Sequence, residues 1–270
     1  MYKLVALDMD GTLLDDGKEI SPANRRAIDE VRARGVEVTF ATGRMFSSAG
    51  FYARQLGLRL PTINYNGALV KDILTRQTLV HYPMPVPLAT EVLSYLRTQD
   101  VYFKVYINDV MYADTGWERT IEFSRRYRVA TSLVDDVSRV PAQAGPPSMI
   151  VMYGEQGLLE EIHKELKALG GDELYLTRSD QGILEVLDYR ASKGKALAWL
   201  ADYLQIPRES ILTVGDNCND LDLFAAGGFS VAMANGAPEA KERADYVTLD
   251  NNEDGVAVAL RKFILGENLP

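Results

Sequence analysis

The sequence predicts an α/β protein with a Rossmann-like, mostly parallel sheet as its core and an inserted α+β domain. Short apolar runs alternate with amphipathic helical stretches before Pro83, and the same alternation returns after Ser192. Strand–helix alternation of this kind implies right-handed crossovers and parallel pairing. Between the two parts the pattern changes to hairpins mixed with helices, which is typical of a partly antiparallel sheet. We therefore expect a discontinuous core at 1–83 and 189–270, with an insert at 84–188.

The first part of the core contains clear helix and turn signals. The expected strands are 4–7, 36–41 and 61–64, and the expected helices are 22–34 and 45–56. Ser21 followed by Pro22 is an N-cap with proline at the first helical position. Gly35 is a typical stop at a helix C-terminus, and Asn66-Gly67 is a strong signal for a hairpin turn.

Three prolines within five residues mark the start of the insert. Pro83, Pro85 and Pro87 favour a stiff, extended linker, because proline fixes φ and lacks an amide donor. Turn residues at Asn108-Asp109 and at 180–182 predict two antiparallel hairpins. Beyond the linker we expect helices at 88–96, 117–127 and 158–169, strands at 101–107, 110–113, 148–153, 174–177 and 183–187, and a loop rich in proline and glycine at 141–147.

The second part of the core restores the strand–helix alternation. Strands are expected at 211–214, 229–233 and 246–248, and helices at 193–203, through Leu223, at 239–243 and at the end of the chain. These strands would complete the sheet that the first part begins, so residues from both ends of the sequence would meet.

The composition limits the classes of function. The 270 residues include 29 Lys and Arg against 38 Asp and Glu, which is a formal net charge of −9. A nucleic-acid backbone or an anionic membrane requires a basic face, so neither is an expected partner. The single cysteine, Cys218, excludes an intramolecular disulfide and a cysteine-based zinc cluster. The sequence contains no signal peptide and no apolar run of transmembrane length, so we expect a soluble, cytoplasmic protein.

Two carboxylates, Asp8 and Asp10, follow the first strand and precede a glycine turn at Gly11-Thr12. Because side chains at i and i+2 of an extended chain lie on the same side, both carboxylates are expected to point the same way. Like charges this close repel each other unless a cation lies between them. Together with Asp216 they offer hard oxygen ligands, which suit Mg²⁺ better than zinc.

Four polar clusters follow predicted strands or begin a helix. They are Asp8/Asp10, Thr42-Gly43-Arg44, Lys193 and Asp216/Asn219/Asp220. Because the C-terminal ends of parallel strands share one edge of a sheet, these clusters can converge on one site. Thr42 offers a hydroxyl and nearby amides that suit an anion, and Lys193 adds a point charge for phosphate. Considered alone, Thr42 could equally cap the following helix, Lys193 could be an ordinary surface lysine and Arg44 could form a structural ion pair.

Four short motifs occur in a fixed order along the chain. They are DMDGTLL at 8–14, TGR at 42–44, SKGKAL at 192–197 and GDNCND at 215–220. In this order and spacing they resemble the motifs of the haloacid dehalogenase (HAD) phosphatase superfamily, and within it the Cof-type hydrolases. Asn66-Gly67-Ala68 is also similar to that family. The insert resembles the large α/β cap of these enzymes, by layout more than by residue.

The resemblance implies catalytic roles for five residues. Asp8 would be the nucleophile that forms an aspartyl-phosphate. Asp10 would protonate the leaving alcohol and then activate water. Thr42 and the Gly43 amide would hold phosphoryl oxygens, and Lys193 would neutralise charge on the phosphoryl group and on Asp8.

The resemblance also implies a Mg²⁺ site. The ion would bind the Asp8 carboxylate, the Asp10 backbone carbonyl and Asp216. Asp220 would order a water in the metal's shell or bind the metal directly. Asn219 would touch the phosphoryl group or its neighbours, and Arg44 would face the leaving group or brace the carboxylates.

The prediction is a Mg²⁺-dependent phosphomonoester hydrolase that acts on small phosphorylated metabolites, such as sugar phosphates. The insert would close over the site and select the leaving group. Its aromatic residues are expected in the apolar core more often than against a ligand; they include Tyr102, Phe103, Tyr106, Tyr112 and Trp117.

Two alternative functions stay open at this point. One is phosphotransfer to another sugar, as in phosphomutase relatives of the superfamily. The other is a non-catalytic module that binds phosphorylated ligands, against which the pair Asp8 and Asp10 argues, because a binder needs no acid–base partner. The sequence leaves open the physiological substrate and the choice between monomer and homodimer.

Overall fold

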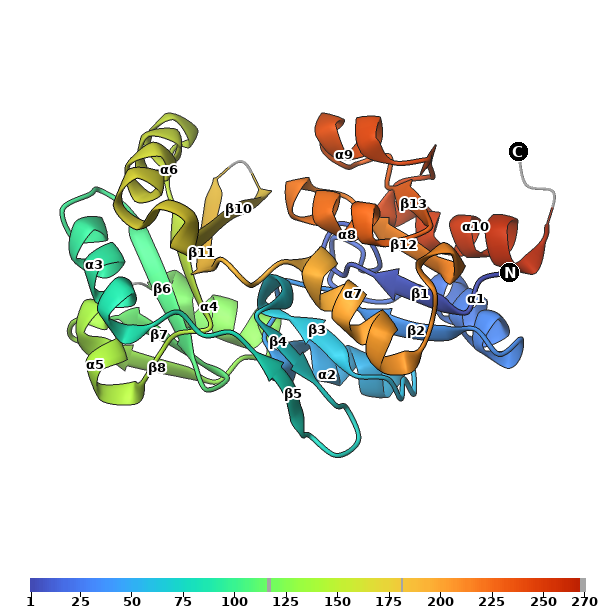
Figure 1. Ribbon diagram of the computed structural model, residues 1–270, viewed down its shortest axis with the longest axis horizontal. Coiled ribbons are helices and arrows are strands. Elements are labelled where there is room, and N and C mark those ends of the chain that lie inside the picture. The colour runs from blue at the N-terminus through green and yellow to red at the C-terminus, as the bar shows by residue number, and fades with distance from the viewer. Residues whose placement is uncertain (116–117, 181, 268–270) are drawn as a thin grey trace.

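The computed structural model describes residues 1–115, 118–180 and 182–267. Figure 1 shows two parts side by side: the two ends of the chain lie together in one part, and the middle of the chain forms the other. We call residues 1–83 and 189–270 the core and residues 84–188 the insert. Within the described ranges, every helix is too short or too polar to cross a membrane.

The core contains a five-stranded parallel sheet in which β1 is an inner strand. The order is β14-β13-β12-β1-β2, and the bounds are β1 Leu4–Leu7, β2 Glu37–Phe40, β12 Ile211–Gly215, β13 Phe229–Ala232 and β14 Tyr246–Val247. β1 pairs in parallel with β2 on one side and with β12 on the other. All four residues of β1 are buried, as expected for a strand with helices on both faces. The predicted parallel sheet is confirmed.

Helices of the core follow the predicted order. They are α1 Pro22–Ala33, α2 Phe46–Gln55, α7 Lys193–Leu204, α8 Leu221–Ala226, α9 Pro238–Arg243 and α10 Gly255–Leu260. Ser21 caps α1 as predicted, because its side chain accepts a hydrogen bond from the Asn24 amide. Gly35 then takes φ of 81°, a conformation that glycine adopts without strain, and the chain turns into β2.

A small antiparallel sheet follows α2, and two of its strands were not predicted. It contains β3 Thr62–Asn64, β4 Leu69–Lys71 and β5 Thr78–His81. The linker is shorter than its prolines predict: it begins after β5 ends at His81, and Pro87 already lies in the first turn of helix α3 (Val86–Leu96). Proline fits there because first-turn amides have no intrahelical partner to lose.

The insert contains a six-stranded mixed sheet. Its order is β10-β11-β9-β6-β7-β8, with bounds β6 Tyr102–Ile107, β7 Val110–Asp114, β8 Thr131–Val134, β9 Met149–Tyr153, β10 Leu174–Asp180 and β11 Ile183–Asp188. The helices are α3, α4 Glu118–Tyr127, α5 Val140–Ala144 and α6 Gln156–Gly170. Both predicted hairpins are present, although Trp117 and Gln181 lie outside the described residues. β8 was missed, and α5 replaces part of the predicted loop, since Pro141 is tolerated in a first helical turn.

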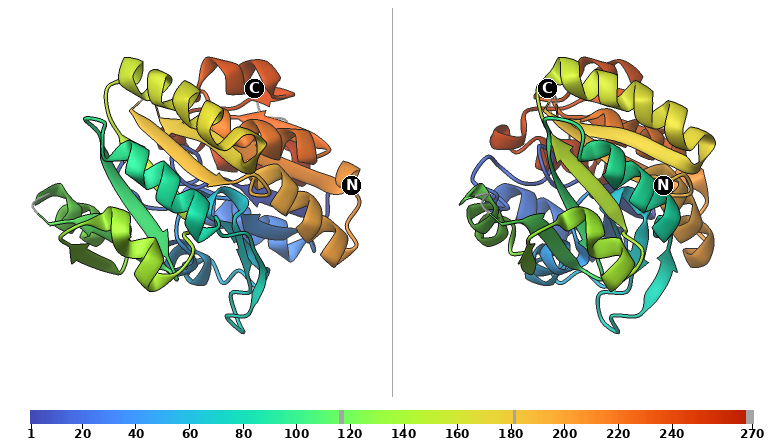
Figure 2. Two further views of the ribbon diagram at one scale, coloured as in Figure 1. Left: turned by 60° about the vertical axis from the view of Figure 1, so that its left-hand side comes forward. Right: turned by 90° about the vertical axis from the view of Figure 1, so that its left-hand side faces the viewer.

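One face of the insert sheet packs on its own helices, and the other faces the core. Figure 2 turns the insert toward the viewer and shows α3 and α6 on the outside of the sheet. Apolar residues under these helices, such as Phe103, Ile150 and Val186, form a separate cluster. Residues on the opposite face, including Tyr106 and Val151, join the apolar cluster of the core. The insert therefore contacts the core through the sheet face that its own helices leave uncovered.

Candidate active site

The candidate site lies at the C-terminal ends of β1, β2 and β12, where all nine predicted residues meet. A cavity of about 210 Å³ opens there. Seven of the nine line it: Asp8, Asp10, Thr42, Gly43, Arg44, Asp216 and Asn219. The other two, Lys193 and Asp220, lie fully buried behind the lining. The parallel pairing of the three strands produces this convergence, because their ends share one edge.

Lys193 is the buried cation of the site. Its Nζ donates hydrogen bonds to Asp8 Oδ1 at 2.8 Å and to Asp220 Oδ1 at 2.7 Å. Burial alone would lower the pKa of Lys193, but the charges of Asp220 and Asp8 outweigh burial and raise the pKa above its usual value. A surface lysine is therefore the wrong interpretation.

The position of Lys193 depends on the turn at Gly67. Gly67 has φ of 96°, and a Cβ there would overlap the Ser192 carbonyl. Only glycine lets this turn approach Ser192, the N-cap residue of α7, so closely.

The carboxylates of Asp8 and Asp216 are buried close together. Burial raises the pKa of Asp8 to about 7, although Lys193 acts in the opposite direction. Burial, followed by repulsion from Asp8 and Asp220, raises the pKa of Asp216 well above its usual value. The Thr12 hydroxyl donates a hydrogen bond to Asp216 Oδ1 at 2.8 Å. Without a further cation, the site thus disfavours full ionisation of these two acids.

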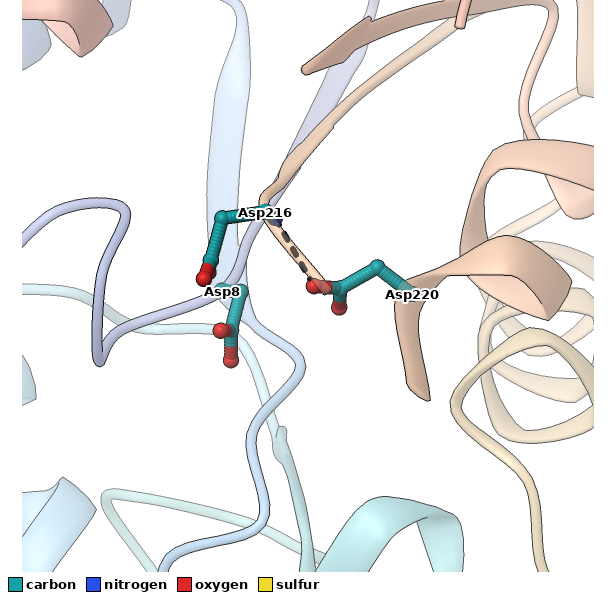
Figure 3. A group of neighbouring side chains, drawn as sticks. All are labelled: Asp8, Asp216 and Asp220. Atoms are coloured by element: carbon teal, nitrogen blue, oxygen red, sulfur yellow. Dashed lines mark hydrogen bonds between the residues drawn. The ribbon is translucent and has the colours of Figure 1, made fainter. Parts of the chain in front are cut away.

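The same carboxylates fit a hard metal ion. Asp8, Asp216 and Asp220 each offer an oxygen, and these three oxygens lie within 4.8 Å of one another (Figure 3). Three buried carboxylates around the single ammonium of Lys193 leave negative charge that a divalent cation would balance. A Cβ on Gly11 would lie 2.5 Å from Asp216 Oδ2, so the glycine turn leaves the space that this carboxylate occupies. Oxygen-only donors of this kind suit Mg²⁺.

Asp220 is held more tightly than the other two acids. Its Oδ2 accepts hydrogen bonds from the Asp216 amide at 2.9 Å and the Asn217 amide at 3.1 Å, while Oδ1 accepts from Lys193. Both oxygens are therefore engaged within the protein. This arrangement suits a residue that orients the loop and Lys193 behind the carboxylates of Asp8 and Asp216.

Asp10 is clamped by two cations. Arg44 donates from Nε at 2.6 Å and from Nη2 at 2.8 Å, and Lys18 Nζ lies 2.9 Å from Asp10 Oδ1. Burial would raise the pKa of Asp10, but hydrogen bonds and charge from Arg44 and then Lys18 lower it to about 2. Arg44 therefore braces a carboxylate, and its guanidinium also lies 5.1 Å from the Tyr52 ring centroid. Lys18 was missed, because one lysine in a polar loop carries no pattern.

Thr42 and Gly43 form the turn between β2 and α2. Thr42 Oγ1 accepts a hydrogen bond from the Arg44 amide at 3.1 Å, whereas α2 begins only after Met45. The alternative in which Thr42 caps α2 is therefore wrong. A residue of the insert caps this helix instead: the Asp109 carboxylate accepts a hydrogen bond from the Ser47 amide at 3.0 Å.

Asn219 belongs to a hydrogen-bond chain that sequence reasoning missed. Its Nδ2 donates to Asn66 Oδ1 at 3.1 Å, and Asn66 Nδ2 donates to Glu185 Oε2 at 2.8 Å. Glu185 lies on β11 of the insert and also accepts from Ser179 Oγ at 3.1 Å. Burial raises its pKa to about 6. A single glutamate within an apolar strand was the only signal for this role.

The roof of the cavity comes from the insert and is mostly apolar or aromatic. The insert residues in its lining are Tyr106, Phe123, Tyr127, Val129, Met149, Val151, Tyr153, Ser179, Asp180, Ile183 and Glu185. Tyr106 packs in the apolar cluster of the core, as expected, and also lines the cavity. Phe103 does pack in the core of the insert, and Trp117 lies outside the described residues.

Lys104 lies behind this roof, almost fully buried. Its Nζ lies 3.4 Å from the Phe123 ring centroid and 4.8 Å from the Tyr153 ring centroid, so cation–π attraction holds both rings. Burial lowers the pKa of Lys104 to about 7.

Polar contacts hold the insert against the core around the cavity. Tyr65 Oη donates to Asp109 Oδ1 at 2.9 Å, and Asn217 Nδ2 donates to the Ser179 carbonyl at 2.9 Å. Because these bonds join residues of both parts, the structure represents a closed arrangement in which the roof covers the acidic cluster.

Comparisons with known proteins agree with this architecture. A family model described as haloacid dehalogenase-like hydrolase matches residues 5–260. Phosphatase YwpJ of Bacillus subtilis (strain 168) is 29% identical over 285 residues, covering 97% of this chain and 100% of the relative. The 5-amino-6-(5-phospho-D-ribitylamino)uracil phosphatase YcsE of the same organism is 30% identical over 266 residues, covering 97% and 96%. The crystal structure of TM0651 from Thermotoga maritima has a TM-score of 0.81 at 32% identity, covering 97% and 98%.

Proposed function

Since this chain belongs to the haloacid dehalogenase-like hydrolase family, we propose that it is a Mg²⁺-dependent phosphatase that hydrolyses small phosphomonoesters through an aspartyl-phosphate. The observation that carries the proposal is the contact of Asp8 with the buried ammonium of Lys193, beside Asp216 at the end of a parallel strand. A nucleophilic carboxylate, a fixed cation and a hard-metal site in one cavity are the parts that phosphoryl transfer requires.

In the first step, one oxygen of the Asp8 carboxylate would attack phosphorus, and the bond from phosphorus to the leaving oxygen would break. Lys193 would offset negative charge on the phosphoryl group as it passes to Asp8. The Thr42 and Gly43 segment at the cavity wall would orient the phosphoryl oxygens. The product of this step is an aspartyl-phosphate and a free alcohol, whose oxygen takes a proton from Asp10.

In the second step, Asp10 would accept a proton from water, which attacks phosphorus and releases phosphate and the Asp8 carboxylate. The clamp of Arg44 and Lys18 favours this ionised, basic form of Asp10. For the first step Asp10 must carry a proton, so its carboxyl group must loosen from at least one of the two cations when substrate binds. The reaction therefore requires the contacts of Asp10 with Arg44 and Lys18 to change between the two steps.

Mg²⁺ would be held by Asp8 and Asp216 together with the Asp10 carbonyl, with Asp220 supporting the site from behind. When bound, it supplies positive charge that keeps the carboxylates ionised and offsets charge on phosphoryl oxygens. Burial of Asp8 and Asp216 supports this assignment, because their pKa values are raised where no ion balances them.

Residues 84–188 would act as the cap domain and residues 1–83 and 189–270 as the catalytic core. A cavity of about 210 Å³ favours a small leaving group, because it is below the roughly 300–1,000 Å³ typical of sites for drug-sized ligands. Aromatic rings in the roof, such as Phe123 and Tyr153, favour a leaving group that carries a planar, unsaturated ring. The name of YcsE describes a phosphate on a ribityl chain that is joined to a uracil ring, which supports a leaving group bearing a heterocycle.

The function is tested by phosphate release from a panel of phosphomonoesters with and without Mg²⁺. Acetyl phosphate, an acyl phosphate whose small leaving group needs few roof contacts and no proton from Asp10, tests attack by Asp8 alone, and ring-bearing and sugar phosphates test the roof. A Phe123→Leu variant should lose the preference for ring-bearing esters and keep its activity on acetyl phosphate. Transfer of phosphate to a sugar acceptor instead of water would favour a mutase, and binding without turnover would favour a non-catalytic module.

A further inference from the structure

A chain of three buried side chains leads from the insert to the phosphoryl site. Glu185 of β11 accepts a hydrogen bond from Asn66, and Asn66 accepts one from Asn219. Glu185, Asn66 and Asn219 are 5%, 1% and 4% exposed, so water competes little for these bonds. Each amide can donate only from nitrogen and accept only at oxygen. The protonation state of Glu185 therefore sets which group donates and which accepts in each of these hydrogen bonds.

An ionised Glu185 can only accept. Asn66 must then point its Nδ2 toward the carboxylate and its Oδ1 toward Asn219, as the recorded contacts show. The Nδ2 of Asn219 is used by this bond, and its Oδ1 is left buried without a hydrogen-bond partner among the described residues. Asn219 lines the cavity, and Oδ1 is the end of its amide that is not bonded to Asn66. Placed against a phosphoryl dianion, which carries only acceptors, this oxygen would oppose another acceptor.

Protonation of Glu185 reverses the donor and acceptor roles in these hydrogen bonds. Its O–H can donate to Asn66 Oδ1 once both amides turn by half a rotation, which changes the positions of few atoms because amide nitrogen and oxygen are similar in size. Asn66 Nδ2 then donates to Asn219 Oδ1, which removes the unpaired acceptor. The Nδ2 of Asn219 becomes free to donate to a phosphoryl oxygen, and Ser179 keeps its bond to Glu185.

We propose that Glu185 is a positioning residue that sets which end of the Asn219 amide faces the phosphoryl group, and that binding of a phosphoryl dianion is accompanied by proton uptake on Glu185. The inference rests on the proposed function in one respect, namely that the phosphoryl group binds beside Asn219. Because Glu185 belongs to the insert, the Asn219 Nδ2 donor is turned toward the phosphoryl group only when the insert covers the core.

The surroundings of Glu185 allow it to change its charge near neutral pH. Burial raises its pKa to about 6, the hydrogen bonds from Asn66 and Ser179 and the charge of Lys193 on α7 act in the opposite direction, and the charge of Asp220 adds to burial. Tyr106 on β6 and Tyr153 on β9 also face it. At pH 7 most of the protein would carry ionised Glu185, so a bound dianion must draw in a proton.

The test is calorimetric titration of the Mg²⁺-loaded protein with sulfate at pH 7, in two buffers of different ionisation enthalpy. Sulfate carries two negative charges and takes up no proton itself in this range. The wild-type protein should take up nearly one proton per bound sulfate, and its affinity should weaken by up to about tenfold per pH unit above pH 6. Glu185→Gln should show neither effect, because its amide donates to Asn66 Oδ1 at every pH.

Two control variants test whether the proton is taken up by Glu185 or by another acid of the cavity. Asn66→Gly tolerates the left-handed backbone at this position, where φ is 46°, and breaks the chain, so it should also lose the proton uptake. Asp180→Asn removes another carboxylate of the cavity lining and should keep the uptake. Asp8 is present in every variant, so the difference between wild type and Glu185→Gln reports on Glu185.

Two outcomes would overturn the proposal: equal proton uptake in wild type and Glu185→Gln, or no uptake in wild type. Phosphate release is assayed in parallel. Proton uptake lost in Glu185→Gln, in a protein without hydrolytic activity, would support the positioning role and reject the proposed function.

Discussion

Lys193→Met tests whether the buried ammonium is what allows the acids of the site to be ionised. In the wild type, Lys193 donates to Asp8 and Asp220 with none of its surface exposed. Methionine keeps much of the side-chain volume and removes the charge. Loss of one partner of a buried ion pair typically costs about 3–5 kcal/mol, because the other charge is left uncompensated.

A loss of this size is measurable as a change in Tm. At roughly 2–4 °C per kcal/mol for a chain of this length, Tm should fall by about 6–20 °C. The measurement is thermal unfolding of the metal-free protein, followed by circular dichroism. Lys195→Met is the matched control, because Lys195 is exposed two residues further along α7, and its loss should be within about 0.5 kcal/mol.

The loss should also depend on pH. An acid whose pKa is raised in the folded state loses stability as pH rises from its unfolded value toward its folded value. Asp8 has a folded pKa of about 7 even with Lys193 present, so the window runs from about pH 4 to above pH 7. Lys193→Met should therefore be more damaging at pH 8 than at pH 5.

Two results would refute a stabilising role of the Lys193 ammonium. If Lys193→Met lowered Tm no more than Lys195→Met, or equally at pH 5 and pH 8, the ammonium would not be stabilising these acids. A double variant, Lys193→Met with Asp220→Asn, should recover part of the loss in Tm, because it removes one carboxylate charge that no longer has a cation beside it. No recovery would indicate that lost packing, and not charge, caused the fall in Tm.

Other predictions address the chemistry and the closure of the insert. Asp8→Asn should abolish phosphate release and the phosphorylated protein detected by mass spectrometry after acid quench; a phosphorylated variant would place the nucleophile elsewhere. Asp10→Asn should lower kcat by roughly 10²–10⁴, measured by phosphate release, and a change below tenfold would contradict its acid–base role. Asp109→Asn weakens the bonds to Ser47 and Tyr65, so KM should rise more than kcat falls; unchanged kinetics would exclude this contact from closure. Mg²⁺ should raise Tm more at pH 8 than at pH 5, because protons compete for its ligands, and Asp216→Ala should remove this effect.

The tertiary arrangement of charges explains why the acids of one motif behave differently. Asp8 and Asp10 are two residues apart, yet burial raises the pKa of Asp8 to about 7, and Arg44 and Lys18 lower that of Asp10 to about 2. Alternation along a strand predicted that both point to the same edge. This alternation did not predict which cation each of the two carboxylates contacts.

The sequence by itself determined the parallel core and the residues that meet at its candidate functional edge, because these depend on local periodicity, caps and glycine turns. Apolar runs ending in polar residues identified β1, β2 and β12, and the motifs after them identified Asp8, Thr42 and Asp216. Strands β4 and β8 escaped, although the predicted β3 is as short as β4. β8 is only partly buried and carries no continuous apolar run that could indicate a strand.

Only the tertiary structure decided which residues of the insert reach the site. Glu185 and Tyr106 lie on strands whose two faces are both buried, so alternation could not distinguish the face toward α3 and α6 from the face toward the core. Lys18 reaches Asp10 from an irregular loop, where no period exists to predict direction. These contacts join residues far apart in the chain, and their geometry follows from how the insert docks on the core. That docking depends on packing between surfaces, which a local pattern does not encode.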